Sequence, residues 1–243
     1  MGRSPEEADM LGLSQDAFGG AYASLLDDRS MAANQRAHGL RLDYLAQLER
    51  INRTALTPAS IRQLDTLLFV YGAAAEVDRH GYGYANLGWA SPYLINPFDG
   101  AYQDLVKFMT TYHPIRSRKD ADAWLARLRL MDDAMLGERR RFETDIANGA
   151  APPKAILQRT LEKVRALTPR TAREHPLVLH FIESLAQIPD IPEGDIKKLV
   201  DEAAGVVGGD IAREYRELDK LLDKAIPQAA DEIGVWKIAQ GDQ

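Results

Sequence analysis

The sequence predicts an all-α fold, an irregular multi-helix bundle with one Gly/Tyr/Pro-rich loop in its middle. Apolar residues recur three and four positions apart over most of the chain, which is the spacing of one helix face. No stretch alternates apolar and polar residues as a half-buried strand does, and no longer segment repeats. Prolines and glycines stand where the periodic segments begin and end. We therefore expect a single helical domain over residues 1–243, with an irregular loop at 79–100.

The N-terminal segment begins with a helix-start signature. Ser4 is a capping residue, Pro5 suits the first helical position, and two glutamates follow in the first turn. This helix is expected to be short and to end at Gly12. Residues 14–28 are rich in turn-forming residues, so no regular helix is predicted there.

Two long helices are predicted next, one over about residues 30–52 and one that opens at Thr57-Pro58. The first carries an apolar stripe and places Arg41 on its solvent side. The second has the most regular periodicity of the chain, and its alanines favour close packing against another helix. The two stripes are Leu40, Tyr44, Leu48 and Ile51 in the first helix and Ile61, Leu64, Leu68, Tyr71 and Ala75 in the second.

The loop at 79–100 leads into a helix that Pro114 ends, because the residue before a proline is pushed out of helical geometry. Pro92, Pro97 and Gly100 keep residues 91–100 from forming a regular helix. His113 is therefore expected at a helix C-terminus. The apolar face of this helix is predicted to be Phe98, Tyr102, Leu105 and Met109.

The remainder of the chain is predicted to be helical. One helix runs from a cap at Ser117 to Asn148-Gly149, where a left-handed glycine ends it, and two prolines open the next. A helix over about 174–188 and a last one over 192–225 follow. Three glycines inside the last helix predict a kink, a break or a close helix crossing, and they are Gly205, Gly208 and Gly209.

Composition and charge argue against several classes of partner and site. The formal net charge of −6 and the pI near 5.4 do not favour nucleic acid or an anionic membrane surface. The absence of cysteine excludes disulfides, thiolate catalysis and cysteine metal sites. No apolar run approaches the roughly 20 residues that span a bilayer, and no hydrophobic signal core stands at the start. We expect a soluble protein, cytoplasmic as the sequence stands, or periplasmic or secreted if a leader has been removed.

No motif for a chemical reaction is found. A helical zinc protease needs two histidines four residues apart, with a glutamate after the first. His175 and His180 are five apart, about 140° from each other around a helix, and Pro176 follows the first of them. We expect His175 at the surface and His180 packed or half-buried. The sequence therefore predicts no catalytic residue and no metal ligand in this chain.

The basic run Arg139-Arg140-Arg141 is expected to be a solvated face. It lies on the polar side of a long predicted helix, where Glu138 and Glu143 are available as ion-pair partners. A phosphate site at this run is the less favoured alternative.

The loop and the helix after it carry the best candidates for binding, because binding residues concentrate on irregular loops held by rigid elements. In the alternative interpretation, Asn96 and Asp99 cap a helix that starts near Pro97, and the tyrosines cover the edge of the core. Both interpretations hold if the loop also faces a cleft. The predicted substrate-binding residues are Tyr82, Tyr84, Asn96, Asp99, Tyr102 and His113.

Five fragments of the chain, in matching order, resemble a known bacterial family. They are the central stretch SPYLINPFDGAYQDLVKFMTTYHPIRSR, Ser4-Pro5-Glu6 with Leu11-Gly12, His113-Pro114-Ile115 with Asp120-Ala121, Pro152-Pro153 after Gly149, and Gly234-Val235-Trp236-Lys237 with Gly241-Asp242. On these fragments the sequence is similar to the domain of unknown function 885, whose members look like zinc peptidases. The similarity extends over nearly the whole chain.

The resemblance implies a two-lobed protein in which two largely helical halves flank a deep cleft. The family's HExxH-type zinc motif is expected in the C-terminal half, beyond Gln243, so this chain is expected to be the N-terminal half without a catalytic motif. Zinc and amide-bond hydrolysis then belong to the missing half, and this half supplies the opposing wall of the cleft. The implied partners are that C-terminal catalytic half, in the same or a separate chain, and a peptide substrate.

A different class of function fits the same residues. The chain would then be a stand-alone helical binding or scaffold module without catalysis, using the face near the tyrosine-rich loop. The apolar segment Ile233–Ile238 close to the terminus favours the half-protein interpretation, because such a segment is expected to pack on a second chain or a continuation.

Overall fold

The structure is a computed structural model that describes residues 4–13, 22–85, 89–168, 171–238 and 241. Parts of the predicted turn-rich segment and of the central loop lie outside these ranges. The described α-helices are α1 (Pro5–Met10), α2 (Met31–Glu49), α3 (Pro58–Asp78), α4 (Ala101–Thr111), α5 (Arg118–Leu128), α6 (Met131–Ala147), α7 (Lys154–Ala166), α8 (Pro176–Leu185), α9 (Glu193–Val206) and α10 (Ala212–Ala225). A short antiparallel pair of strands, β1 (Tyr84–Ala85) and β2 (Ala90–Ser91), joins α3 to α4. The all-α prediction is confirmed.

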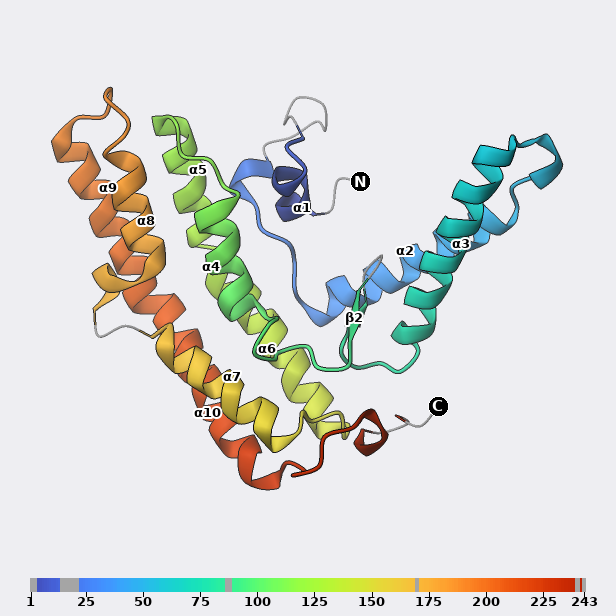
Figure 1. Cartoon of the computed structure of the whole chain (residues 1–243). Helices are drawn as coiled ribbons and strands as arrows, with labels where there is room; N and C mark the ends of the chain where they lie inside the picture. The colour runs from blue at the N-terminus through green and yellow to red at the C-terminus, as the bar shows by residue number, and fades with distance from the viewer. Residues whose placement is uncertain (1–3, 14–21, 86–88, 169–170, 239–240, 242–243) are drawn as a thin grey trace.

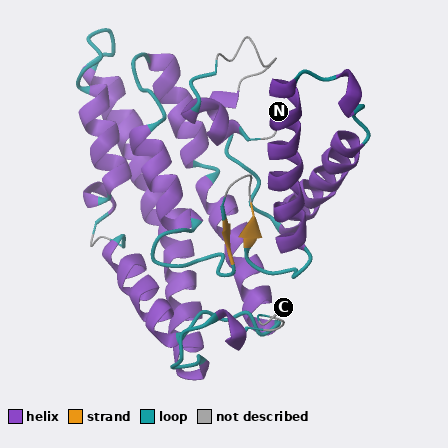
Figure 2. Ribbon diagram, turned by 45° about the vertical axis from the view of Figure 1, so that its right-hand side comes forward, coloured by secondary structure: helices purple, strands orange, loops and turns teal. Residues whose placement is uncertain are grey.

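The helices form a large bundle and a separate two-helix arm (Figure 1). The bundle consists of α4 to α10, and the arm consists of α2 and α3, which project from one side of the bundle. Figure 2 shows the two strands between the arm and the bundle. None of the described helices combines the length and the apolar composition that crossing a membrane requires.

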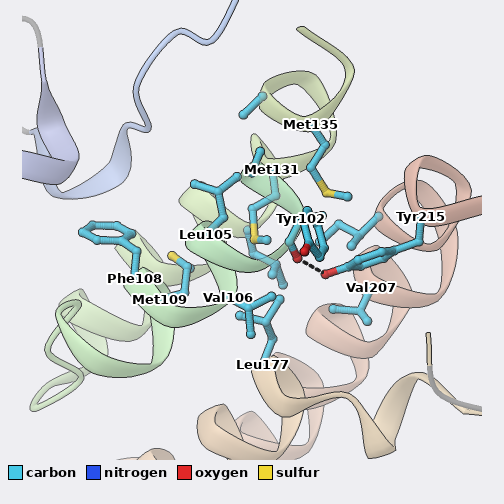
Figure 3. Packing of buried hydrophobic residues seen from close by; sticks show 14 of the residues in the cluster. Tyr102, Leu105, Val106, Phe108, Met109, Met131, Met135, Leu177, Val207 and Tyr215 are labelled. Atoms are coloured by element: carbon cyan, nitrogen blue, oxygen red, sulfur yellow. Dashed lines mark hydrogen bonds between the residues drawn. The ribbon is translucent and has the colours of Figure 1, made fainter. Parts of the chain in front are cut away.

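The core lies between two layers of the bundle. One layer is α4, α5 and α6, and the other is α7 to α10, with α4 packed on α8, α5 on α9 and α6 on α10. The Trp124 and Phe181 rings stack across the layers with centroids 4.3 Å apart. Tyr215 donates a hydrogen bond of 2.5 Å to the carbonyl oxygen of Tyr102 at the centre of the cluster (Figure 3). Burial of these large side chains is the main force that holds the layers together.

The arm departs from the sequence prediction. The stripe of Leu40, Tyr44, Leu48 and Ile51 was expected to be buried, but α2 contains no buried residue, because it packs mainly on α3. Arg41 does not lie on a solvated side, since its guanidinium donates to Asp78 with Nε and Nη2 at 2.6 and 2.8 Å. A bidentate ion pair thus ties the two helices of the arm together at the end near the bundle.

The single helix predicted from Ser117 to Asn148 is two helices, α5 and α6. The backbone N–H of Leu130 bonds to the carbonyl oxygen of Arg127, which closes α5, and the Leu130 carbonyl oxygen then accepts the N–H of Ala134 in α6. No proline or glycine marks the junction, so the apolar periodicity runs through it unbroken.

Two glycine predictions are confirmed. Gly149 has a φ of 86° directly after α6, as a left-handed helix end requires. Of the three glycines in the last predicted helix, Gly208 and Gly209 lie in a π-helical turn (Val207–Ile211) between α9 and α10, whereas Gly205 lies within α9. The wider turn interrupts the helix there and divides it into two parts.

Candidate functional site

An open pocket of about 530 Å³ lies where the arm meets the bundle. Its walls are the segment before α2, one side of α2, strand β1, the loop before α4, the start of α4 and the middle of α6. Five carboxylates and three arginines line it, together with the aromatic rings of Tyr84 and Trp89. The charged residues are Asp27, Asp28, Asp99, Asp104 and Glu138 on one hand and Arg29, Arg41 and Arg141 on the other. The size suits a small ligand or a short peptide segment.

The segment before α2 is held against α6 by a close backbone approach. A Cβ at Gly137 would lie 3.2 Å from the backbone of Arg29 and Ser30, so a glycine lets the two chains come together. Arg29 then reaches two carboxylates, Glu6 at 2.8 Å and Glu138 at 3.3 Å. These ion pairs fix one wall of the pocket across elements far apart in sequence.

Glu138 also caps α4. One carboxylate oxygen accepts the backbone N–H of Ala101, while the other pairs with Arg29. A carboxylate at a helix N-terminus satisfies unpaired N–H groups and complements the helix dipole. The start of α4 is therefore capped from a different helix, by a residue 37 positions later in the chain.

The turn before α4 is organised by Asn96. Its side-chain oxygen accepts the backbone N–H groups of Phe98 and Asp99 at 2.8 and 3.1 Å, and its Nδ2 donates to the Asp99 carboxylate at 2.9 Å. The expectation that Asn96 and Asp99 cap a helix starting near Pro97 is wrong, since α4 begins at Ala101. Asn96 instead caps the turn itself.

Phe98 also departs from its predicted place. It was expected on the apolar face of the helix, but it precedes α4 and is 82% exposed. With Tyr93, Trp89 and residues of α7 it lines a second pocket of about 450 Å³, which shares Trp89 and Asp99 with the first. The loop thus separates two hollows of the surface.

Strand β1 is clamped to α6 through Gly83. The Asp145 carboxylate accepts the backbone N–H of Gly83 at 3.0 Å, and Arg141 donates to the carbonyl oxygen of Gly83 at 3.2 Å. Gly83 has a φ of 66°, and a Cβ there would lie 2.2 Å from the carbonyl oxygen of Ser91. Glycine is therefore required at this position both for conformation and for space.

Burial raises the pKa of two carboxyl groups that line the pocket. The pKa of Asp27 rises to about 6, through burial and then the nearby Glu6 carboxylate. The pKa of Asp104 also rises to about 6 through burial, opposed by the hydrogen bond that it accepts from the N–H of Gly100. The pKa of the Tyr84 phenol is raised by burial and by Asp99. These groups change their charge near neutral pH or stay protonated there.

Three of the predicted binding residues line the two pockets. Tyr84 and Asp99 line the larger pocket, and Asn96 and Asp99 line the smaller one. Their role in binding stays a prediction. Tyr82 lines neither pocket and lies against the ring of His80, with centroids 5.7 Å apart.

Tyr102 and His113 lie elsewhere. Tyr102 is 1% exposed in the core, and its hydroxyl donates to the carbonyl oxygen of Asn96 at 3.0 Å, so it supports the loop from below. His113 follows α4 as predicted, but it is buried against Arg127. The structure therefore does not bring these two side chains to either pocket.

The sequence analysis missed Arg29, Asp104, Glu138 and Arg141 as pocket residues. Arg141 belongs to the basic run that was expected to be solvated, yet it is 9% exposed, whereas Arg139 pairs with Glu143 and Glu214. Arg139 therefore pairs with carboxylates, whereas Arg141 donates to the carbonyl oxygen of Gly83. A helix turns 100° per residue, so a run of three cannot share one environment.

The described residues do not fit a zinc site. No group of three histidine or acidic side chains among them could hold a metal ion. His175 was expected at the surface, but it is 1% exposed and caps α8 by accepting the N–H of Leu177. His180 is partly buried, 3.5 Å from the hydroxyl of Ser184.

Comparisons with known proteins show the family through a family model and the fold through a solved structure. The bacterial family described as "Bacterial protein of unknown function (DUF885)" matches residues 5–242. A solved structure described as "the putative lipoprotein from Colwellia psychrerythraea" superposes with a TM-score of 0.90 at 20% sequence identity. The match covers 99% of this chain and 42% of that one. No curated protein matches the chain.

Proposed function

The chain belongs to the DUF885 family, and we propose that it forms the non-catalytic, substrate-binding wall of a larger zinc-dependent, peptidase-like hydrolase. The observation that carries the proposal is the charged pocket between the arm and the bundle. It is built from six separate segments of the chain and fixed by ion pairs, as a preorganised binding wall would be.

The larger protein is part of the proposal. The chain spans 42% of the length of the Colwellia psychrerythraea structure, so a protein of that length has room for a second, catalytic part. The resemblance described above implies an HExxH-type zinc motif, and we propose that this motif lies in that second part. Since the described residues of this chain do not fit zinc, its proposed role is limited to binding and orienting substrate.

The wall is suited to hold rather than to react. Arg29 and Glu138 neutralise each other within it, and Asn96 fixes the turn that carries Asp99. Groups already held by hydrogen bonds lose little freedom when a ligand binds. A peptide lying in the pocket would therefore be positioned without rearrangement of the backbone.

We also propose that the larger protein is exported from the cytoplasm. The solved neighbour is described as a "putative lipoprotein", which supports the periplasmic or secreted alternative over the cytoplasmic one.

The test uses the protein as isolated from its native host. We expect a species larger than this 27.0 kDa chain, or a complex of it, to contain about one zinc and to hydrolyse peptides until a chelator removes the metal. A metal-free 27.0 kDa monomer without peptidase activity would overturn the proposal and leave the binding or scaffold module.

A further inference from the structure

We propose that Arg141 binds the terminal carboxylate of a short peptide with free termini in the charged pocket. This inference rests on the proposed function, because it assumes that the pocket faces the substrate. It adds to the proposed function the chemical group of the substrate that is recognised.

Arg141 is the arginine of the pocket that lacks a carboxylate partner. Arg29 pairs with two glutamates and Arg41 pairs bidentately with Asp78. The guanidinium of Arg141 instead donates to one backbone carbonyl, that of Gly83 at 3.2 Å, and no carboxylate of the described residues lies within ion-pairing distance. It is 91% buried, because its exposed fraction is 9%, and it lines the pocket.

Such an arginine has donors to spare. A guanidinium carries five N–H groups in a planar fork that matches the two oxygens of a carboxylate. Burial lowers the pKa of Arg141, and the charges around it are those of Glu138, Asp145, Asp78 and Arg29. A buried guanidinium that donates to a carbonyl and forms no ion pair with the carboxylates around it can still gain from a directly bound anionic ligand.

The acidic side of the pocket favours a ligand that also carries a positive charge. The Asp99 carboxylate accepts from Asn96, and the Asp104 carboxylate accepts from the N–H of Gly100, but neither pairs with a cation among the described residues. With five carboxylates against three arginines, the pocket repels a dianion such as phosphate. A peptide with a free amino group and a free carboxylate matches both sides.

Arg141 also helps to hold β1, so a structural role must be separated from binding. Its hydrogen bond to Gly83 would be lost in any substitution, and binding could then fall because the loop moves. A loop defect weakens every peptide alike, whereas loss of a carboxylate contact affects only peptides that have one. The chemical end of the probe therefore distinguishes the two roles.

The experiment is calorimetric titration of the whole chain with three forms of Ala-Ala-Ala, which are the free peptide, its C-terminal amide and its N-acetylated form. The variants are Arg141→Gln and, as a matched control on the same helix, the exposed Arg140→Gln. We expect the wild type and the control to bind the free peptide about 10-fold or more tighter than the amide. Arg141→Gln is expected to bind both about equally.

Several outcomes would overturn the inference. Equal binding of the free peptide and the amide by the wild type would do so even if Arg141→Gln does not fold. The inference would also be wrong if a folded Arg141→Gln kept the preference for the free peptide, if inorganic phosphate bound more tightly than the peptide, or if no peptide bound. Equal binding of the acetylated and free peptides would show that the positive group is not recognised. Because binding is read without hydrolysis, an inactive native protein would leave the inference intact.

Discussion

Nδ1 of His113 lies 2.6 Å from Nη1 of Arg127, inside the bundle. Arginine can only donate hydrogen bonds, so Nδ1 must be the acceptor, and the ring proton is on Nε2. That nitrogen lies 3.3 Å from the carbonyl oxygen of Asp120, to which it donates. The pair closes the end of α4 onto α5.

Arg127 extends this contact to the N-terminal segment. It is 0% exposed, and its other N–H groups donate to the backbone carbonyls of Leu25 and Tyr22 and to the carboxylate of Asp9. Replacing it by methionine leaves these acceptors, which are buried or partly buried, without their donor. We expect Arg127→Met to lower the free energy of unfolding by about 3–5 kcal/mol in urea titrations.

The matched control for this change is Arg129→Met. Arg129 is two residues away, its side chain is 53% exposed, and it pairs with Glu202 at the surface. It should cost less than about 1 kcal/mol. Equal costs for the two substitutions would contradict the anchoring role of Arg127.

His113 should make the fold sensitive to acid. Burial, and then the Arg127 charge, lowers the pKa of His113 to about 4 from its usual 6.5. The unfolded chain therefore takes up the proton first as pH falls, so stability present above pH 6.5 is lost between 6.5 and 4. In His113→Gln, whose amide can accept from Arg127 and donate to Asp120, this loss should disappear.

The measurement is the difference in unfolding free energy between wild type and His113→Gln from pH 7.5 to 4. As pH falls, we expect the wild type to lose up to about 3 kcal/mol of unfolding free energy relative to His113→Gln. Asp27, Asp104 and Asp145 have the opposite sign, since their pKa values are raised to about 6 and they favour the fold as pH falls through 6. They are present in both proteins and cancel. A difference independent of pH would refute the prediction.

The arm should open as a unit when Asp78 is neutralised. Its carboxylate is 7% exposed and accepts from Arg41 and from Nδ1 of His38 at 2.9 Å. Since α2 has no buried residue, its packing on α3 includes little of the apolar burial that resists local opening. We expect Asp78→Asn to raise amide hydrogen exchange in α2 and α3 by about 10-fold or more while the bundle keeps its protection. Asp65→Asn, which removes the exposed pair with Arg53, is the control and should change little.

The sequence predicted those parts of the fold that depend on local chemistry. Ser4, Thr57 and Ser117 cap helices where a capping residue precedes a periodic segment, and Gly149 ends α6. The apolar stripe of α2 was predicted because periodicity shows which residues share a face. It does not show whether a neighbour covers that face.

The pocket could be predicted only in part, for the same physical reason. The glycines, tyrosines and prolines of the loop predicted a binding region there, and Tyr84 and Asp99 do line the pocket. Glu138 caps Ala101 from 37 residues away, and no local pattern announces such a contact. The environment of Arg141 is set by Gly83 and α6 together, so its burial inside a basic run has no signature in the sequence.

Gly83 should be the position at which the pocket is most sensitive to a single methyl group. A Cβ at Gly83 would lie 2.2 Å from the Ser91 carbonyl oxygen and 2.9 Å from Pro92, both backbone atoms that cannot turn away. The N–H and carbonyl of Gly83 are also held by Asp145 and Arg141. Gly83→Ala must therefore break the strand pair or its clamp, and we expect a loss of about 3 kcal/mol or more.

Gly81→Ala separates this crowding from conformational strain. Gly81 has a similar φ, 70° against 66°, but nothing lies within 4 Å of a Cβ there. Gly81→Ala should lower the free energy of unfolding by about 1–2 kcal/mol, because the only penalty is an alanine in the left-handed conformation. Thermal unfolding measures both costs, and the affinity for peptide should fall only in Gly83→Ala, because only that change moves Arg141 and β1. If the two alanine variants proved equally stable, the close approach at Ser91 would not be what shapes the pocket.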